Sequence, residues 1–297
     1  MKVIDIFAGP GGLGEGFSAF EENGKSPFEL SLSIEKDVSA HSTLLLRSFY
    51  RQFEADSIPD DYWEYLKGNI TKFDLFDRYP RQLVRAHDEA RCLELGKTPH
   101  KEIKNLISHK IKDTKKWVLV GGPPCQAYSL VGRARMNSNP DFEKDERHFL
   151  YLEYLKIIAD HRPPVFVMEN VKGLLSAQHG GKRMIERIMG DLRQPGLALT
   201  GKKSGLSYNL FSLVDEHESD EIDPAAFLVK AEEYGIPQAR HRILILGIRS
   251  DIDITPLRMD KNIAPSVLEI ISDLPRIRST LSKEADTYSA WRIPYHQ

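Results

Sequence analysis

The chain of 297 residues is poor in cysteine, and this excludes one class of fold at the outset. Its only cysteines, Cys92 and Cys125, are too few for the disulfide framework of a small secreted domain. No apolar run approaches the length needed to cross a bilayer, and the first residues lead into a strand pattern without a signal-peptide pattern. We therefore expect a cytoplasmic protein, without membrane association, in which at least one thiol is free for chemistry.

An excess of either charge is also lacking. Lys and Arg number 41 and Asp and Glu 43, so the chain as a whole does not have the basic character of many nucleic-acid-binding proteins. Any contact with nucleic acid must come from local patches. Residues 78–116 carry eleven basic and five acidic side chains, and we interpret them as a basic helical insertion without a strand. An ordinary solvated helical surface explains the same charges.

The pattern that is present is an alternation of short apolar runs and helical segments. The runs that predict strands are residues 3–7, 30–34, 117–120, 164–168, 208–214 and 242–248. Apolar residues at helical spacing occupy residues 13–22, 38–50, 149–160 and 183–192. This order predicts a doubly wound α/β domain, with a mostly parallel sheet covered by helices on both faces. Ligands of such sheets bind beyond the carboxyl ends of the strands.

A glycine-rich turn follows the first predicted strand. Gly9, Gly11 and Gly14 fit the G-x-G-x-x-G pattern, which lets the backbone approach a ligand closely at the start of a helix. Glu35 ends the second strand, where a carboxylate can accept hydrogen bonds from ribose hydroxyls. These residues favour a nucleoside-containing cofactor without specifying which one. A tight turn with a purely structural role is the alternative.

Cys125 lies just beyond the strand at residues 117–120, on a turn stiffened by Pro123 and Pro124. A thiol at this edge of the sheet is a candidate nucleophile, because the thiolate is the reactive form of cysteine. Cys92, within the predicted helical insertion, is instead expected to be an inert buried residue.

Charged residues mark the ends of two further strands. Glu169 follows the strand at residues 164–168, and Arg240 and Arg242 lie at the start of the last one. Taken singly, each is typical of a satisfied surface charge.

Four segments together resemble, in order, the motifs of the bacterial DNA (cytosine-5)-methyltransferase family. They are DIFAGPGG at residues 5–12, PPCQ at 123–126, ENV at 169–171 and QARHR at 238–242. The resemblance covers residues 1–250 and implies a Rossmann-like, S-adenosylmethionine-dependent catalytic domain. It implies that residues 251–297 lead into a target-recognition region that is missing or truncated. We therefore expect either a fragment of a longer enzyme or one subunit of a split enzyme whose partner supplies recognition.

The resemblance also implies roles for individual residues. The cofactor S-adenosylmethionine would be bound by Phe7, Gly9, Pro10, Gly12, Glu35, Asn69, Ile70, Pro123 and Leu150. Double-stranded DNA would be contacted by Gln126, Ser129 and Gln238. Arg133 and Arg135 belong to a polar loop at residues 128–147 that is suited to contacting phosphates, although an ordinary surface loop explains the same residues. The family usually has Asp at the position of Asn69 and often an aromatic residue at that of Lys36.

The implied reaction is methyl transfer to carbon 5 of a flipped-out cytosine. Cys125 would add to carbon 6, and a protonated or proton-sharing Glu169 would neutralise the charge that develops at nitrogen 3. Arg242 and Arg240 would hold the base, and no metal is required. Restriction-modification is a reasonable biological setting.

Three alternatives stay open at this point. A nicotinamide- or flavin-dependent oxidoreductase would use the glycine turn and Glu35 but leaves Cys125 unexplained. A subunit that is inactive without a separate C-terminal partner would bind DNA or cofactor only. Methylation of transfer RNA by a related branch is less favoured, because residues 126–129 resemble the DNA-acting pattern.

Overall fold

The computed structural model describes residues 1–124, 150–179, 182–215 and 223–274, with Ala285, Thr287 and Ser289. The strands are β1 (Lys2–Ile6), β2 (Glu29–Glu35), β3 (Ala90–Cys92), β4 (Trp117–Gly121), β5 (Val165–Val171), β6 (Gln178–His179), β7 (Lys182–Arg183), β8 (Tyr208–Phe211), β9 (Leu228–Lys230) and β10 (His241–Arg249). The α-helices are α1 (Gly12–Ala19), α2 (Val38–Tyr50), α3 (Asp60–Leu66), α4 (Lys72–Arg78), α5 (Pro80–Glu89), α6 (His100–Ile111), α8 (Leu150–His161), α9 (Met184–Arg193), α10 (Pro195–Thr200) and α11 (Val267–Ile271).

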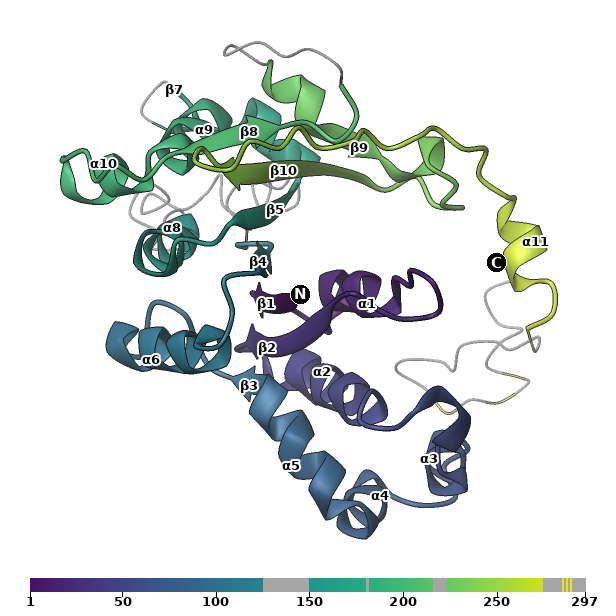
Figure 1. The fold of residues 1–297 in the computed structure, drawn as a ribbon. Coiled ribbons are helices and arrows are strands. Elements are labelled where there is room, and N and C mark those ends of the chain that lie inside the picture. The colour runs from purple at the N-terminus through teal and green to yellow at the C-terminus, as the bar shows by residue number, and fades with distance from the viewer. Residues whose placement is uncertain are drawn as a thin grey trace. The chain divides into compact units, whose positions relative to one another are not determined.

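The main sheet has the strand order β3-β2-β1-β4-β5-β10-β8, with β9 paired to β10. The five strands from β3 to β5 are parallel, whereas β10 runs antiparallel to β5, β8 and β9. Figure 1 shows α1 and α2 on one face of the sheet and α6 and α8 on the other. The sheet is therefore doubly wound and mostly parallel, and this confirms the predicted fold class.

The alternating side chains of the buried strands supply two cores. On the face covered by α6 and α8, Ile4, Ile6 and Phe166 belong to one large cluster of buried apolar residues. On the opposite face Val3 and Val120 form a smaller cluster with residues of α1 and β2. Because parallel strands bury both faces, their carboxyl ends and the loops that leave them are the parts available for chemistry.

Residues 78–116 are largely helical, as predicted, but the expectation that they contain no strand is wrong. The segment forms α5, β3 and α6, and β3 is an edge strand that pairs in parallel with Ser33–Glu35 of β2. Cys92 is likewise neither helical nor buried, since it ends β3 and is exposed. A strand of three residues is too short to show a periodicity, and its pairing with β2 is a tertiary contact. The remaining predicted strands and helices are present with shifted ends; β8, for example, ends at Phe211.

Contacts between residues divide the chain into two compact units. The first consists of residues 1–230 and 240–260, and the second of residues 231–239 and 261–297. In the second unit a capping box between Ser266 and Glu269 starts the short helix α11. Residues 251–260 thus belong to the first unit, and the predicted division at residue 250 stays a prediction. No helix in the described parts of the chain is long and apolar enough to span a membrane.

Candidate active site

The glycine-rich turn connects β1 to α1 through left-handed backbone conformations. The φ angles of Phe7, Gly9 and Gly11 are 56°, 57° and 95°. Gly11 is the N-cap of α1, and a Cβ atom there would lie 2.9 Å from Cδ1 of Leu44 on α2. Only glycine combines this dihedral with this close approach. The turn is therefore packed against α2 on one side, while a Cβ at Gly9 would meet no atom of the described residues within 4 Å.

Glu35 fixes the turn from the end of β2. Its Oε2 accepts a hydrogen bond of 2.8 Å from the backbone N–H of Gly9. Its Oε1 accepts from the backbone N–H groups of Lys36 and Asp37, at 2.8 and 2.7 Å. Asp37 in turn caps α2 by accepting from the N–H of Ala40. One carboxylate thus joins the turn, the end of β2 and the start of α2.

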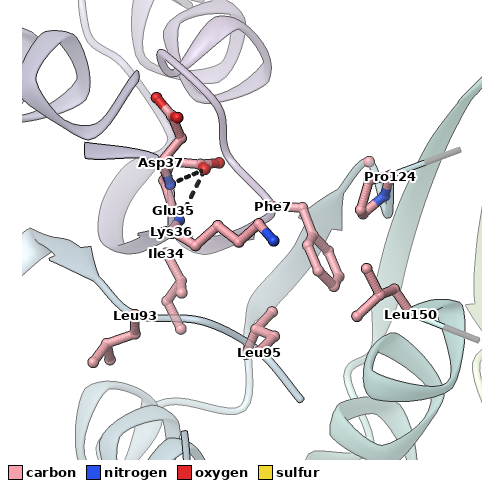
Figure 2. Close-up of a pocket in the computed structure, with 10 residues that line it drawn as sticks. Phe7, Ile34, Glu35, Lys36, Asp37, Leu93, Leu95, Pro124 and Leu150 are labelled. Atoms are coloured by element: carbon pink, nitrogen blue, oxygen red, sulfur yellow. Dashed lines mark hydrogen bonds between the residues drawn. The ribbon is translucent and has the colours of Figure 1, made fainter. Parts of the chain in front are cut away.

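A pocket of about 380 Å³ opens beside Glu35, and Figure 2 shows Phe7, Leu150 and Pro124 grouped at one side of it. Its lining consists of Phe7, Ile34, Glu35, Lys36, Asp37, Leu93, Leu95, Gly122, Pro124 and Leu150. Apolar walls with one fixed carboxylate suit a nucleoside, whose ring is flat and whose ribose presents hydroxyls. The structure thus brings together three residues that the sequence assigned to the cofactor, namely Phe7, Glu35 and Leu150.

Asn69 and Ile70 are not among the residues that line this pocket. Nδ2 of Asn69 donates to Oε2 of Glu64 at 2.5 Å, just beyond the end of α3, and Ile70 packs against the core formed by α2 and α5. Leu93 and Leu95 line the pocket instead, directly after β3. Their place after a strand is the signal that could have identified them, but β3 has only three residues and shows no strand pattern in the sequence.

Lys36 borders the same pocket with a charge. Its Nζ donates to Oε1 of Glu94 at 3.1 Å, and Lys97 also pairs with Glu94. The end of β2 and the loop after β3 are thereby linked at the rim. Figure 2 shows the Lys36 side chain extending toward Phe7, so the rim of the pocket is polar where its walls are apolar.

A second group of candidate site residues lies at the carboxyl ends of β4 and β5. A Cβ at Gly121 would lie 2.4 Å from the carbonyl oxygen of Ile6, and a Cβ at Gly122 would lie 3.0 Å from Oε2 of Glu169. Nδ2 of the buried Asn170 donates to the carbonyl oxygen of Pro123 at 3.4 Å. The proline turn that leads to Cys125 is therefore tied to the end of β5. Cys125 itself lies outside the described residues.

Glu169 and Arg242 face each other across β5 and β10. Nε of Arg242 lies 2.7 Å from Oε1 of Glu169, at an angle that does not meet hydrogen-bond geometry. Nη1 of Arg242 donates to the carbonyl oxygen of His241. The two side chains are 27% and 23% exposed, so the pair is open enough to be reached by a ligand. A carboxyl group and a guanidinium in contact at a strand end can together bind the polar edge of a flat base.

The structure describes some of the other predicted site residues but not all of them. Arg240 is exposed in the first unit, and Gln238 is exposed in the second. Pro10 and Gly12 belong to the glycine turn, and Pro123 precedes the lining residue Pro124. Gln126, Ser129, Arg133 and Arg135 lie outside the described residues. Within the described ranges, no group of three or more His, Cys, Asp or Glu side chains could hold a metal ion.

The similarity of the chain to known proteins agrees with this geometry. The chain is 31% identical to the type II methyltransferase M.Bpa9945I of Bacillus paralicheniformis, over 94% of the chain and 61% of that protein. It is 29% identical to the type II methyltransferase M.AquIA of Picosynechococcus, over 84% of the chain and 72% of that protein. The chain thus spans about three fifths of the length of the first of these relatives.

A solved structure from E. coli, described as a DNA modification methyltransferase encoded within a prophage, has the same fold. It superimposes with a TM-score of 0.54 at 21% identity, over 94% of the chain and 57% of its own length. The family model for C-5 cytosine-specific DNA methylases matches residues 89–294. This match includes the ends of β4, β5 and β10. The chain therefore belongs to the C-5 cytosine-specific DNA methylase family.

Proposed function

We propose that this protein transfers a methyl group from S-adenosylmethionine to carbon 5 of cytosine in double-stranded DNA. The single observation that supports this most strongly is the contact between Glu169 and Arg242 beside the proline turn that leads to Cys125. A nicotinamide- or flavin-dependent oxidoreductase would leave both features without a role. The family to which the chain belongs favours the same reaction.

The residues that line the pocket fit the nucleoside part of S-adenosylmethionine. Glu35 would accept hydrogen bonds from the ribose hydroxyls, and Phe7, Leu95 and Leu150 would enclose the base. Because the Glu35 carboxylate is already fixed by backbone N–H groups, little ordering is left for the moment of binding. When bound, the cofactor supplies an electrophilic methyl group on a sulfonium.

Cys125, Glu169 and Arg242 would carry the chemistry on the base. The thiolate of Cys125 adds to carbon 6 of cytosine, and the electron pair displaced from the C5–C6 bond makes carbon 5 nucleophilic. A proton from Glu169 at nitrogen 3 neutralises the charge that develops on the ring, and Arg242 stabilises that charge. Carbon 5 would take the methyl group and S-adenosylhomocysteine would be released. Loss of the carbon 5 proton to water, return of the nitrogen 3 proton to Glu169 and departure of the Cys125 thiolate would then restore the aromatic ring.

The target carbon is inaccessible within a base-paired duplex. The cytosine must therefore rotate out of the stack, which takes about a few kcal/mol. Arg133 and Arg135 would contact phosphates from the segment between residues 128 and 147, and Gln126, Ser129 and Gln238 would contact DNA near the base. Arg240 would support the base beside Arg242.

The test is transfer of labelled methyl from S-adenosylmethionine to mixed-sequence duplex DNA by the purified chain. We expect label on carbon 5 of cytosine, with loss of the label in Cys125→Ala. Cys92→Ala is the matched control, because this exposed thiol lies on β3 and is predicted to leave transfer unchanged. Undiminished transfer by Cys125→Ala would contradict the proposal.

A second subunit that supplies DNA recognition stays a prediction. If such a subunit exists, the chain alone should bind S-adenosylmethionine but transfer little label, and transfer should appear when a candidate partner is added. The cytoplasmic location and the restriction-modification setting likewise stay predictions.

A further inference from the structure

Asp5 is a buried carboxyl group that the proposed reaction does not use. It lies in β1 beneath the glycine turn, with no exposed surface. Neither of its oxygens has a hydrogen-bond partner among the described residues. The same holds for Oγ of Ser33, the residue opposite Asp5 on β2, and for Nε of Arg51, the C-cap residue of α2. A buried polar group without a partner is destabilising, so a cluster of them calls for an explanation.

The carboxyl group of Asp5 touches the first turn of α1. Its Oδ2 lies 3.2 Å from the position that a Cβ on Gly14 would occupy. The Gly14 N–H faces this carboxyl, although the contact lies outside hydrogen-bond geometry. Gly14 is close to the start of α1, at Gly12, and α1 begins where the glycine turn ends. Asp5 therefore packs directly against the first turn of α1, the helix that follows the glycine turn.

The charges around Asp5 are mostly negative. The charge of Arg51, the C-cap residue of α2, acts on Asp5, but its guanidinium is already in contact with Glu15 of α1 and Glu89 of α5. Glu35 on β2 adds a further negative charge. From α8, on the other face of the sheet, the neutral phenol of Tyr154 approaches, and the neighbour of Asp5 on β4 is the apolar Val120. Within the described ranges, no Lys or Arg side chain pairs with Asp5 alone.

We propose that Asp5 is a positioning residue whose protonated form holds α1 and the glycine turn in the shape that binds the cofactor. When the carboxyl is neutral, it can remain sealed between β1, β2 and α1. When it ionises, it must be hydrated or paired, and both require α1 to move away from the sheet together with the turn from Gly9 to Gly12. Cofactor affinity then falls as the proton is lost.

The burial of Asp5 favours its protonated form at neutral pH. It raises the pKa of Asp5 to about 7, and the nearby Glu35 and Glu89 act in the same direction, whereas Gly14 and Arg51 oppose the shift. Linkage then requires the converse effect: a cofactor that binds the protonated form raises the pKa of Asp5 further. The inference rests on the proposed function, since it assumes S-adenosylmethionine as the ligand.

The experiment is calorimetric titration of the whole chain with S-adenosylmethionine between pH 6 and pH 8.5. For the wild-type protein we expect the Kd to rise about tenfold or more over this range. Asp5→Asn keeps the shape of the neutral carboxyl, and its Kd should change much less. Ser33→Ala is the matched control: it removes the neighbouring unpartnered hydroxyl but no titratable proton, and should keep the wild-type pH profile. The amino group of the cofactor also titrates, but it does so equally with every variant.

A second measurement covers the case in which Asp5→Asn fails to fold. In wild-type protein with 13C-labelled aspartate carboxyl groups, a resonance should titrate near neutral pH, and its midpoint should rise when cofactor is added. A wild-type profile retained by Asp5→Asn, or a titration that cofactor does not move, would overturn the inference while leaving the proposed function intact. Absence of cofactor binding at every pH would instead overturn the proposed function and the inference with it.

Discussion

The two carboxylates at the ligand edge of the sheet, Glu35 and Glu169, are held in different ways. Glu35 accepts three hydrogen bonds from backbone N–H groups, whereas Glu169, as far as the chain is described, forms an ion pair with the side chain of Arg242. Backbone donors cannot rotate away, but a guanidinium can exchange one partner for another. Under the proposed function, the cofactor half of the site, around Glu35, is therefore organised before binding, while the catalytic half, around Glu169 and Arg242, keeps an ion pair that a base can displace.

The largest effect is expected from Glu169→Gln in the catalytic half. The amide cannot deliver a proton to nitrogen 3 of cytosine, so methyl transfer should fall about a hundredfold or more. Cofactor affinity, measured by calorimetry, should not change, because the cofactor half is untouched. Glu186→Gln is the matched control: this exposed glutamate is also paired with an arginine, Arg183, and its loss should leave transfer as it was. Equal activity of the two variants would contradict the distinction between the halves.

The next effect concerns stability and pH in the cofactor half. The pKa of Asp5 is raised by burial from 3.8 to about 7, so the folded protein keeps a proton that the unfolded chain releases. The stabilisation from this proton is complete below about pH 4 and is lost as pH rises through about 7. The difference in the free energy of unfolding between the wild type and Asp5→Asn, measured with urea, should therefore change by roughly 2–4 kcal/mol over this pH range. A constant difference between the two proteins at every pH would show that Asp5 does not titrate.

Glu35→Gln should weaken cofactor binding rather than catalysis at saturating cofactor. An amide has one acceptor oxygen, so at least one backbone N–H of the turn or of Lys36 and Asp37 loses its partner. We expect a Kd for S-adenosylmethionine that is about ten to a hundred times higher. Thr71→Ala, which removes the capping box of α4, is the matched control. It should lower the free energy of unfolding by about 1 kcal/mol without any change in Kd.

The smallest expected effect is a difference in stability between alanine substitutions at two glycines of α1, Gly14 and Gly16. A Cβ at Gly14 would lie 3.1 Å from Leu30 and 3.2 Å from Asp5, whereas a Cβ at Gly16 would meet nothing within 4 Å. Gly14→Ala should therefore destabilise the fold by about 1 kcal/mol or more, and Gly16→Ala should stabilise it by about 0.5–1 kcal/mol. Thermal unfolding of both variants measures this. Stabilisation by both would mean that α1 is not packed tightly on Asp5.

The outcome for β3 explains where prediction from the sequence ended. The strands β1, β4, β5 and β10 have five to nine residues and are rich in apolar side chains, so their existence and the fold class could be predicted from the sequence pattern. β3 has three residues and no pattern, and it is a strand only because β2 offers it a free edge. Because β3 could not be predicted, Leu93 and Leu95 were not identified as lining residues. The predicted cofactor contact of Asn69 stays a prediction, since Asn69 is not among the residues that line the pocket.

The sequence by itself determined the doubly wound fold, the order of the motifs and the placement of Glu35 at the end of a strand. These features follow from local patterns, because burial repeats with the period of a strand or a helix. Only the tertiary structure decided which side chains share the pocket, that Glu169 meets Arg242, and that Asp5 is sealed beneath Gly14. Each of these depends on contacts between segments far apart in the chain, and the free energy of burying a charge is set by those neighbours rather than by the residue that carries it.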